Sequence, residues 1–125
     1  MTDLAPWNVI LIDDEPDSLN LISDMLALNG AQVHRAVSGM DGLALMREIT
    51  PTLVIMDLSM PKPDGWEVLS QMRAMPGMAN VPAVAITAYS SDNVIKRAGQ
   101  AGFTALIPKP IKLNILLSKL HEIVG

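Results

Sequence analysis

Short runs of apolar residues alternate with helical periodicity along the whole chain. The runs at residues 9–12, 53–56 and 81–86 are almost wholly apolar, which is typical of strands buried on both faces. Between such runs, apolar residues recur at helical spacing, as Leu21, Ile22 and Met25 do. The pattern therefore predicts strands and helices in alternation.

Turn and capping residues mark where these elements begin and end. Expected strands span residues 9–12, 31–37, 53–56, 81–86 and 103–107. Expected helix starts are Pro16, Ser38 with Asp41, Asp64 with Glu67, and Ser90 or Ser91, and expected stops are Asn29-Gly30, Pro51, Pro76-Gly77 and Gly102. Five strand-then-helix units predict an α/β fold, a doubly wound five-stranded parallel sheet with helices on both faces and right-handed crossovers.

The composition fits one domain over residues 1–125, with its core at about 8–124. The chain is half hydrophobic and has no cysteine, which excludes a disulfide framework and a thiolate metal site. No apolar stretch approaches the roughly 20 residues of a membrane span, and the first residues lack the features of a signal peptide. A net charge of −4 without a basic stripe argues against nucleic acid as a ligand. We therefore expect a cytoplasmic domain that binds neither membranes nor nucleic acid directly.

Polar and charged residues follow the predicted strands at the point where each one ends. Asp13 and Asp14 follow the first strand, Asp57 the third, Thr87 the fourth and Lys109 the fifth. In a parallel sheet these ends share one edge, which is where such folds hold their ligands. Two carboxylates about 4 Å apart near a protein surface repel by roughly 4 kcal/mol. One lysine cannot neutralise three carboxylates, so we expect a hard divalent cation, Mg²⁺, among them.

The remaining groups indicate what the cation helps to bind. A phosphoryl group needs counter-charge on its equatorial oxygens. Thr87 can donate to one oxygen, Lys109 can pair with another, and Mg²⁺ can take the third. Asp57 is then left as the attacking oxygen, which would form an aspartyl phosphate.

The same residues carry a resemblance to a known family. In chain order they are Asp13-Asp14, Asp57, Met60-Pro61, Asp64-Gly65, Thr87-Ala88 and Lys109-Pro110. With these motifs the chain resembles a response-regulator receiver domain of two-component signalling, from about Asn8 to Val124. The resemblance implies a flavodoxin-like sheet in the order 2-1-3-4-5.

The resemblance also implies roles for the residues of the metal site. Asp57 resembles the phosphoacceptor. Asp14 and Asp57 resemble direct Mg²⁺ ligands, joined by the backbone carbonyl of Ser59, while Asp13 acts through water. The domain would then assist its own phosphorylation and dephosphorylation without being an enzyme.

Thr87 resembles the switch hydroxyl and Lys109 the cation that pairs with the phosphate, with a cis bond to Pro110. The chain departs from the family at Leu106, where receivers usually carry an aromatic residue that moves with the threonine. Tyr89, the only tyrosine, is expected beside the site, where it would slow attack of water on the acyl phosphate.

The partners implied are a sensor histidine kinase or a histidine phosphotransfer protein, with acetyl phosphate as a small donor. A downstream protein would bind the face formed by the fourth helix, the fifth strand and the fifth helix. Candidate contacts there are Asn93, Lys96, Arg97, Gln100, Leu106 and Lys119. The domain is expected either to stand alone or to be cut from a larger protein.

Two other functions compete with this interpretation. An Mg²⁺-dependent phosphohydrolase with an aspartyl nucleophile typically has a second aspartate two residues later, where this chain has Ser59. A flavodoxin-like binding module needs a loop rich in glycine and hydroxyl groups after the first strand. The chain has Asp13-Asp14-Glu15 in that loop, which would repel a phosphate.

Overall fold

The computed structural model describes Leu4 and residues 7–124. Within this part, strands and helices alternate without exception. The strands are β1 (Asn8–Ile12), β2 (Gln32–Ala36), β3 (Leu53–Asp57), β4 (Ala83–Thr87) and β5 (Ala105–Pro108). The helices are α1 (Pro16–Leu28), α2 (Gly39–Glu48), α3 (Gly65–Arg73), α4 (Asp92–Ala101) and α5 (Leu113–Val124).

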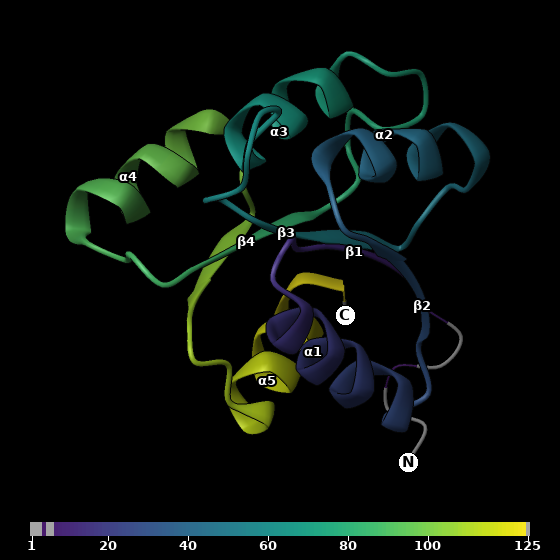
Figure 1. The fold of residues 1–125 in the computed structure, drawn as a ribbon, viewed down its shortest axis with the longest axis vertical. Helices are drawn as coiled ribbons and strands as arrows, with labels where there is room; N and C mark the ends of the chain where they lie inside the picture. The colour runs from purple at the N-terminus through teal and green to yellow at the C-terminus, as the bar shows by residue number, and fades with distance from the viewer. Residues whose placement is uncertain (1–3, 5–6, 125) are drawn as a thin grey trace.

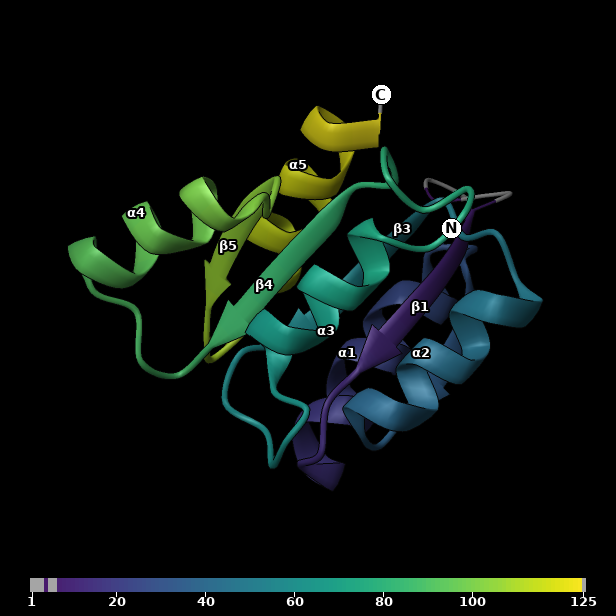
Figure 2. The same cartoon turned by 90° about the horizontal axis from the view of Figure 1, so that it is seen from above.

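The strands form one parallel sheet in the order β2-β1-β3-β4-β5, as predicted. Helices α1 and α5 cover one face of the sheet, and α2, α3 and α4 cover the other (Figure 1). Figure 2 shows the strand arrows of β1, β4 and β5 pointing to the same edge. The strand ends at this edge and the loops that leave it carry the predicted site residues, so the fold brings them together.

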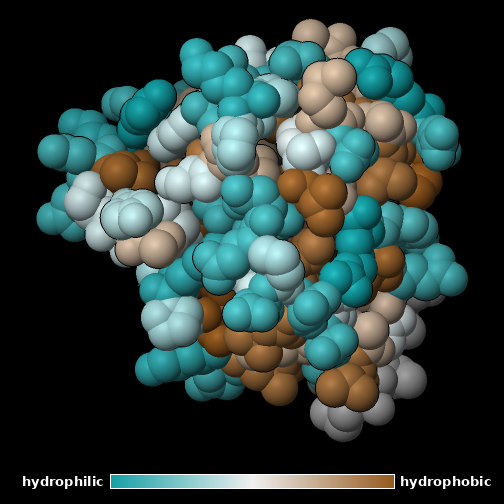
Figure 3. Space-filling view, viewed as in Figure 1, coloured by the Kyte–Doolittle hydropathy of each residue, from teal (hydrophilic) through white to brown (hydrophobic). Residues whose placement is uncertain are grey.

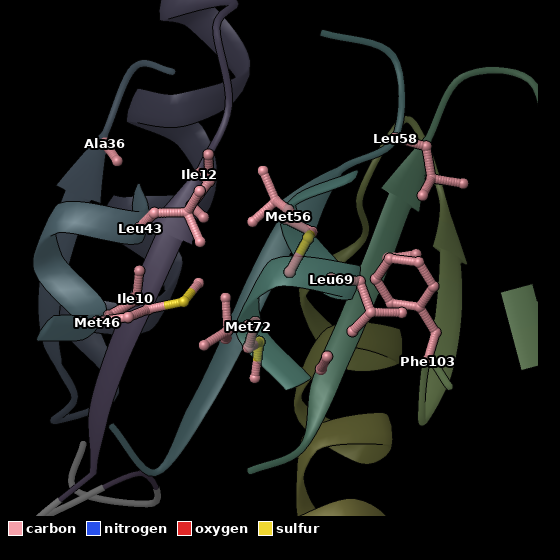
Figure 4. Packing of buried hydrophobic residues seen from close by; sticks show 14 of the residues in the cluster. Ile10, Ile12, Ala36, Leu43, Met46, Met56, Leu58, Leu69, Met72 and Phe103 are labelled. Atoms are coloured by element: carbon pink, nitrogen blue, oxygen red, sulfur yellow. The ribbon is translucent and has the colours of Figure 1, made fainter. Parts of the chain in front are cut away.

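The central strands are apolar throughout because both of their faces are covered. In β1, Ile10 and Ile12 pack in the cluster beneath α2 and α3, while Val9 and Leu11 pack in the cluster beneath α1 and α5. Figure 4 shows the first cluster, in which Leu43 of α2 lies beside Ile12. Alternate side chains of one strand thus serve two separate cores.

Capping residues begin the helices largely where the sequence predicts. Pro16 lies at the first position of α1, Ser38 and Ser91 accept backbone hydrogen bonds at the starts of α2 and α4, and Asp64 and Glu67 complete a capping box on α3. Of the two serines proposed for α4, Ser91 is the cap.

The predicted fifth strand began two residues too early, at 103 instead of 105. Gly102 takes a left-handed φ of 110°, and the N–H of Phe103 donates to the carbonyl of Ala98. This pairing belongs to the end of α4, so Phe103 closes the helix instead of starting the strand. The fourth strand likewise starts later than predicted, at Ala83, because Val81 still donates to Met78 in a turn.

Not every apolar residue of the helices is buried. Leu21 of α1 is 48% exposed and Ile95 of α4 is 51% exposed. In the described part of the chain, no helix is long and apolar enough to cross a bilayer.

Candidate functional site

Three carboxylates meet at the carboxyl edge of the sheet. Asp13 and Asp14 follow β1, and Asp57 ends the neighbouring strand β3. One oxygen from each lies within 4.8 Å of the others. Asp13 is fully buried and Asp57 is 5% exposed, whereas Asp14 faces solvent. The cluster predicted from the strand ends is therefore confirmed as a spatial group.

Lys109 lies between the two buried carboxylates. Its Nζ is 2.8 Å from Oδ2 of Asp57 and 3.1 Å from Oδ2 of Asp13. The peptide bond to Pro110 is cis, as the resemblance implied. The sequence placed Lys109 at this edge, but it did not predict that its ammonium would pair with both acids directly.

Backbone donors fix the orientation of both buried carboxylates. The N–H of Ser59 donates to Oδ1 of Asp57 at 2.9 Å, and the N–H of Glu15 donates to Oδ1 of Asp13 at 3.0 Å. Gly65 begins α3 directly against Asp57, since a Cβ at Gly65 would lie 2.4 Å from the Asp57 carbonyl oxygen. Only glycine allows α3 to approach the site this closely.

Burial and neighbouring charges shift the pKa values of two groups in the site, Asp57 and Lys109. Burial raises the pKa of Asp57, and the hydrogen bonds from Lys109 and the Ser59 N–H only partly oppose this shift. Burial by itself would lower the pKa of Lys109, but the nearby carboxylates of Asp57 and Asp13 outweigh it and raise that pKa. The ammonium form of Lys109 is thus favoured, whereas the ionised form of Asp57 remains costly.

Thr87 ends β4, next to Asp57, and is almost completely buried. Its Oγ1 accepts a hydrogen bond of 3.0 Å from the N–H of Tyr89. Tyr89 is 74% exposed. Its proposed shielding of the site therefore stays a prediction.

The donor set fits a hard divalent cation. Every side-chain ligand atom in the cluster is a carboxylate oxygen, which is what Mg²⁺ prefers. Oδ2 of Asp13 is buried without a hydrogen-bond partner, although Lys109 lies at ion-pair distance. An unsatisfied buried oxygen beside an exposed carboxylate is suited to a cation or its bound water.

Other interactions near this edge were not foreseen. A second cis peptide bond joins Lys62 and Pro63 in the loop between β3 and α3. The guanidinium of Arg97 lies over the ring of Trp66. The contact between Arg97 and Trp66 has no signature in the sequence, because these residues are 31 positions apart and meet only after the helices have packed.

Comparison with known proteins decides the family. Residues 9–121 match the family model of the response regulator receiver domain. The chain belongs to this family. It is 33% identical to an uncharacterised 14.6 kDa protein of Leptolyngbya boryana, over 89% of this chain and 85% of that protein. It is 28% identical to the polar-differentiation response regulator DivK of Brucella anthropi, over 96% of this chain and 98% of DivK.

Solved structures agree on the fold of this receiver domain. The chemotaxis protein CheY4 of Vibrio cholerae matches with a TM-score of 0.90 at 24% identity, covering 95% of this chain and 99% of that one. A putative response regulator of Chloroflexus aurantiacus also matches with a TM-score of 0.90 at 24% identity, covering 95% and 98%.

Membership of the family establishes the general function. Receiver domains are phosphorylation-dependent signalling switches of two-component systems, and they work with histidine kinases or phosphotransfer proteins. They are phosphoacceptors and are not generally classed as enzymes. The phosphohydrolase and flavodoxin-like interpretations are not favoured by these relatives.

Proposed function

We propose that Asp57 is the phosphoacceptor of this switch. The observation that carries the proposal is the position of its carboxylate at the carboxyl end of β3, with Lys109 Nζ 2.8 Å from Oδ2 and two further aspartates beside it. Asp13 shares Lys109 and is fully buried, and Asp14 lies toward solvent. The carboxylate of Asp57 is therefore held in one orientation by the Ser59 N–H and paired with the ammonium group of Lys109.

The reaction is a transfer of a phosphoryl group to a carboxylate oxygen. An oxygen of Asp57 attacks phosphorus, and a new oxygen–phosphorus bond forms. The bond from phosphorus to the donor breaks, and its electron pair leaves with the imidazole nitrogen of phosphohistidine or with the carboxylate of acetyl phosphate. Lys109 balances charge on the transferred group, and the hydroxyl of Thr87 donates a hydrogen bond to one of the phosphoryl oxygens. Because these groups stand ready in the domain, it assists its own phosphorylation and the later hydrolysis.

Asp13, Asp14 and Asp57 are the residues that would hold Mg²⁺, together with the backbone carbonyl of Ser59. When bound, the cation supplies counter-charge to the acid cluster and to the phosphoryl oxygens. The shared location of the carboxylate oxygens and the unsatisfied Oδ2 of Asp13 support this assignment.

The phosphodonor protein is proposed to dock in a groove beside Lys109. This groove has a volume of about 360 Å³, and its walls include Asp17 and Leu21 of α1 and Pro110 and Ile111 of the loop before α5. In Figure 3, which views the molecule as in Figure 1, hydrophobic side chains gather over α1 and α5 with hydrophilic ones around them. An apolar floor with an acidic rim suits a helix that carries apolar and basic residues around its phosphohistidine.

The downstream partner is proposed to bind the face formed by α4, β5 and α5. Asn93, Lys96 and Gln100 of α4 and Lys119 of α5 are exposed there, while Leu106 of β5 is half-buried. A phosphoryl group adds nearly two negative charges close to Thr87. Movement of Thr87 and its loop toward that charge would displace α4 and change this face.

Phosphorylation in solution tests the assignment of Asp57. Incubation with acetyl phosphate and Mg²⁺, followed by intact mass measurement, is expected to show one base-labile phosphoryl adduct. Asp57→Asn should lose the adduct, and chelation of Mg²⁺ should prevent it in the wild type. Asp24→Asn is the matched control, because Asp24 is an exposed residue of α1. An adduct that persists in Asp57→Asn would show that another residue accepts the phosphoryl group.

A further inference from the structure

The core holds α4 less firmly than it holds the three helices that precede it in the chain. Ala98 is the one buried residue of α4, whereas α1, α2 and α3 bury four residues each. Ile95 of the same helix is half exposed. Buried apolar area provides most of the stability of a helix in a protein. The few remaining contacts of α4 therefore have a large influence on where it lies.

One of these contacts joins α4 to α3 through an aromatic ring. The Cζ atom of Arg97 lies 4.0 Å from the centroid of the Trp66 ring, within the range of a cation–π interaction. Trp66 in turn meets Phe103 edge to face, with 5.8 Å between ring centroids and an interplanar angle of 76°. Phe103 is buried, so the tryptophan is anchored on the core side while Arg97 lies on the exposed side.

The end of α4 is held separately. Arg73, the last residue of α3, donates to the carbonyl of Gly102 at 3.1 Å and to the carbonyls of Met78 and Val81 at 3.0 and 2.6 Å. Gly102 is the C-cap of α4. With this end pinned, a displacement of α4 would be a swing about its C-terminus, and Arg97 is the residue that would have to leave Trp66.

Both partners of this contact are linked to the phosphorylation site. Trp66 follows Gly65, which packs against the backbone of Asp57. At the other end, α4 begins at Asp92, five residues after Thr87, whose Oγ1 accepts a hydrogen bond from the N–H of Tyr89. If the Thr87 side chain turns toward a phosphoryl group, its hydrogen bond with the Tyr89 N–H breaks. The loop between Thr87 and α4 would then move and pull the start of α4 with it.

We propose that the contact between Arg97 and Trp66 is a releasable latch that couples the position of α4 to the occupancy of Asp57. The inference rests on the proposed role of Asp57. The latch coexists with the direct ion pair between Lys109 and Asp57, which a phosphoryl group on Asp57 would replace. Arg97 is thus a positioning residue of the switch. The aromatic ring in this coupling is that of Trp66. Position 106, where receivers usually carry an aromatic residue, is leucine in this chain.

The coupling has a direction that can be measured. A ligand shifts a two-state equilibrium only by its differential affinity for the two states, and the coupling is reciprocal. A mutation that opens the latch therefore shifts the equilibrium towards the state that the ligand favours, before the ligand binds. An exposed cation–π contact corresponds to a change of about two- to fivefold in an equilibrium constant. Loss of the Arg97 charge should tighten binding at Asp57 by this factor.

The test uses the phosphoryl mimic beryllofluoride with Mg²⁺, titrated by calorimetry and by tryptophan fluorescence. A Trp7→Phe background leaves Trp66 as the only tryptophan. In that background, Arg97→Met keeps the aliphatic stem without the charge, Arg97→Lys keeps a cation, and Arg47→Met makes the same charge change on the exposed surface of α2. We expect Arg97→Met to bind beryllofluoride about two- to fivefold more tightly, with Arg97→Lys and Arg47→Met close to the parent.

Fluorescence separates a latch from a merely structural arginine. Beryllofluoride should change the emission of Trp66 in the parent and in Arg47→Met, and should change it little in Arg97→Met, where the ring is already uncovered. Equal affinity in Arg97→Met and Arg47→Met would overturn the latch, and so would binding to the parent that leaves the Trp66 emission unaltered. A parent protein that binds no beryllofluoride by calorimetry would overturn the proposed role of Asp57 as well.

Discussion

At the scale of single residues, the site concentrates negative charge that the fold does not fully balance. Asp13 and Asp57 are both buried, and they share one ammonium group, that of Lys109. The raised pKa of Asp57 shows that burial of its charge outweighs the help from Lys109 and from the Ser59 N–H. The buried charge of Asp57 therefore costs stability in the free protein.

Asp57→Asn is expected to stabilise the domain when Mg²⁺ is absent. The amide can still accept the hydrogen bond from the Ser59 N–H, and Lys109 keeps Asp13 as its partner. We expect the free energy of unfolding at neutral pH to rise by about 0.5–2 kcal/mol, measured by urea denaturation in the presence of a chelator. Asp24→Asn, an exposed substitution, should change it little, and a variant less stable than the wild type would contradict the account.

The sign of the pH dependence follows from the same pKa values. Because the folded state raises the pKa of Asp57 above its usual 3.8, the cost of ionising Asp57 is complete above the folded pKa and declines as the pH falls from there towards 3.8. The advantage of Asp57→Asn should therefore shrink in acid. Lys109, whose pKa is raised, contributes stability that is complete below 10.5 and is lost as the pH rises through the folded value.

At the scale of elements, close packing of helices on the sheet depends on particular glycines. A Cβ on Gly42 of α2 would lie 2.2 Å from Cδ1 of Ile12, which is fully buried in β1. Gly99 of α4 has no atom within 4 Å of the corresponding position. The same residue type thus has a packing role in one helix and none in the other.

Alanine at these two positions should have opposite effects. Gly42→Ala overpacks the interface between α2 and β1 and is expected to lower the free energy of unfolding by about 1–3 kcal/mol. Gly99→Ala is expected to raise it by about 0.5–1 kcal/mol, because alanine has the higher helix propensity. Thermal or urea unfolding of the pair measures both, and a Gly42→Ala variant as stable as Gly99→Ala would contradict the tight approach of α2.

At the scale of the whole molecule, burial is distributed unevenly among the helices that cover the sheet. The strands β1, β3 and β4 are buried almost throughout, and α1 and α3 each bury four residues against them. Helix α4 lies at the side of the molecule, at the left in Figure 1, with one buried residue. We therefore expect α4, which follows the loop after Thr87, to be the helix that is most easily displaced.

Hydrogen exchange should show this gradient. Backbone amides of α4 (Asp92–Ala101) are expected to exchange faster than those of α3 (Gly65–Arg73), although both helices have a side-chain cap. Mass spectrometry of peptides from the two segments measures the difference. Equal protection of α3 and α4 would show that the sparse burial of α4 does not weaken it.

The sequence by itself determined the elements, their order along the chain and the residue types at each strand end. These properties depend on local pattern, because hydrophobic period and capping chemistry act over a few residues. Asp13, Asp57, Thr87 and Lys109 could be assigned to one edge in this way, since parallel strands must all end on the same side. Leu106 could be recognised as a departure from the family for the same local reason.

The tertiary structure alone decided which side chains touch and how deeply each is buried. Lys109 contacts two carboxylates, Arg97 covers Trp66, and Leu21 and Ile95 face solvent despite their place on apolar stripes. The physical reason is that burial depends on how each helix is rotated and seated on the sheet, and that is set by packing among residues far apart in the chain. The same packing decides how much of α4 is buried.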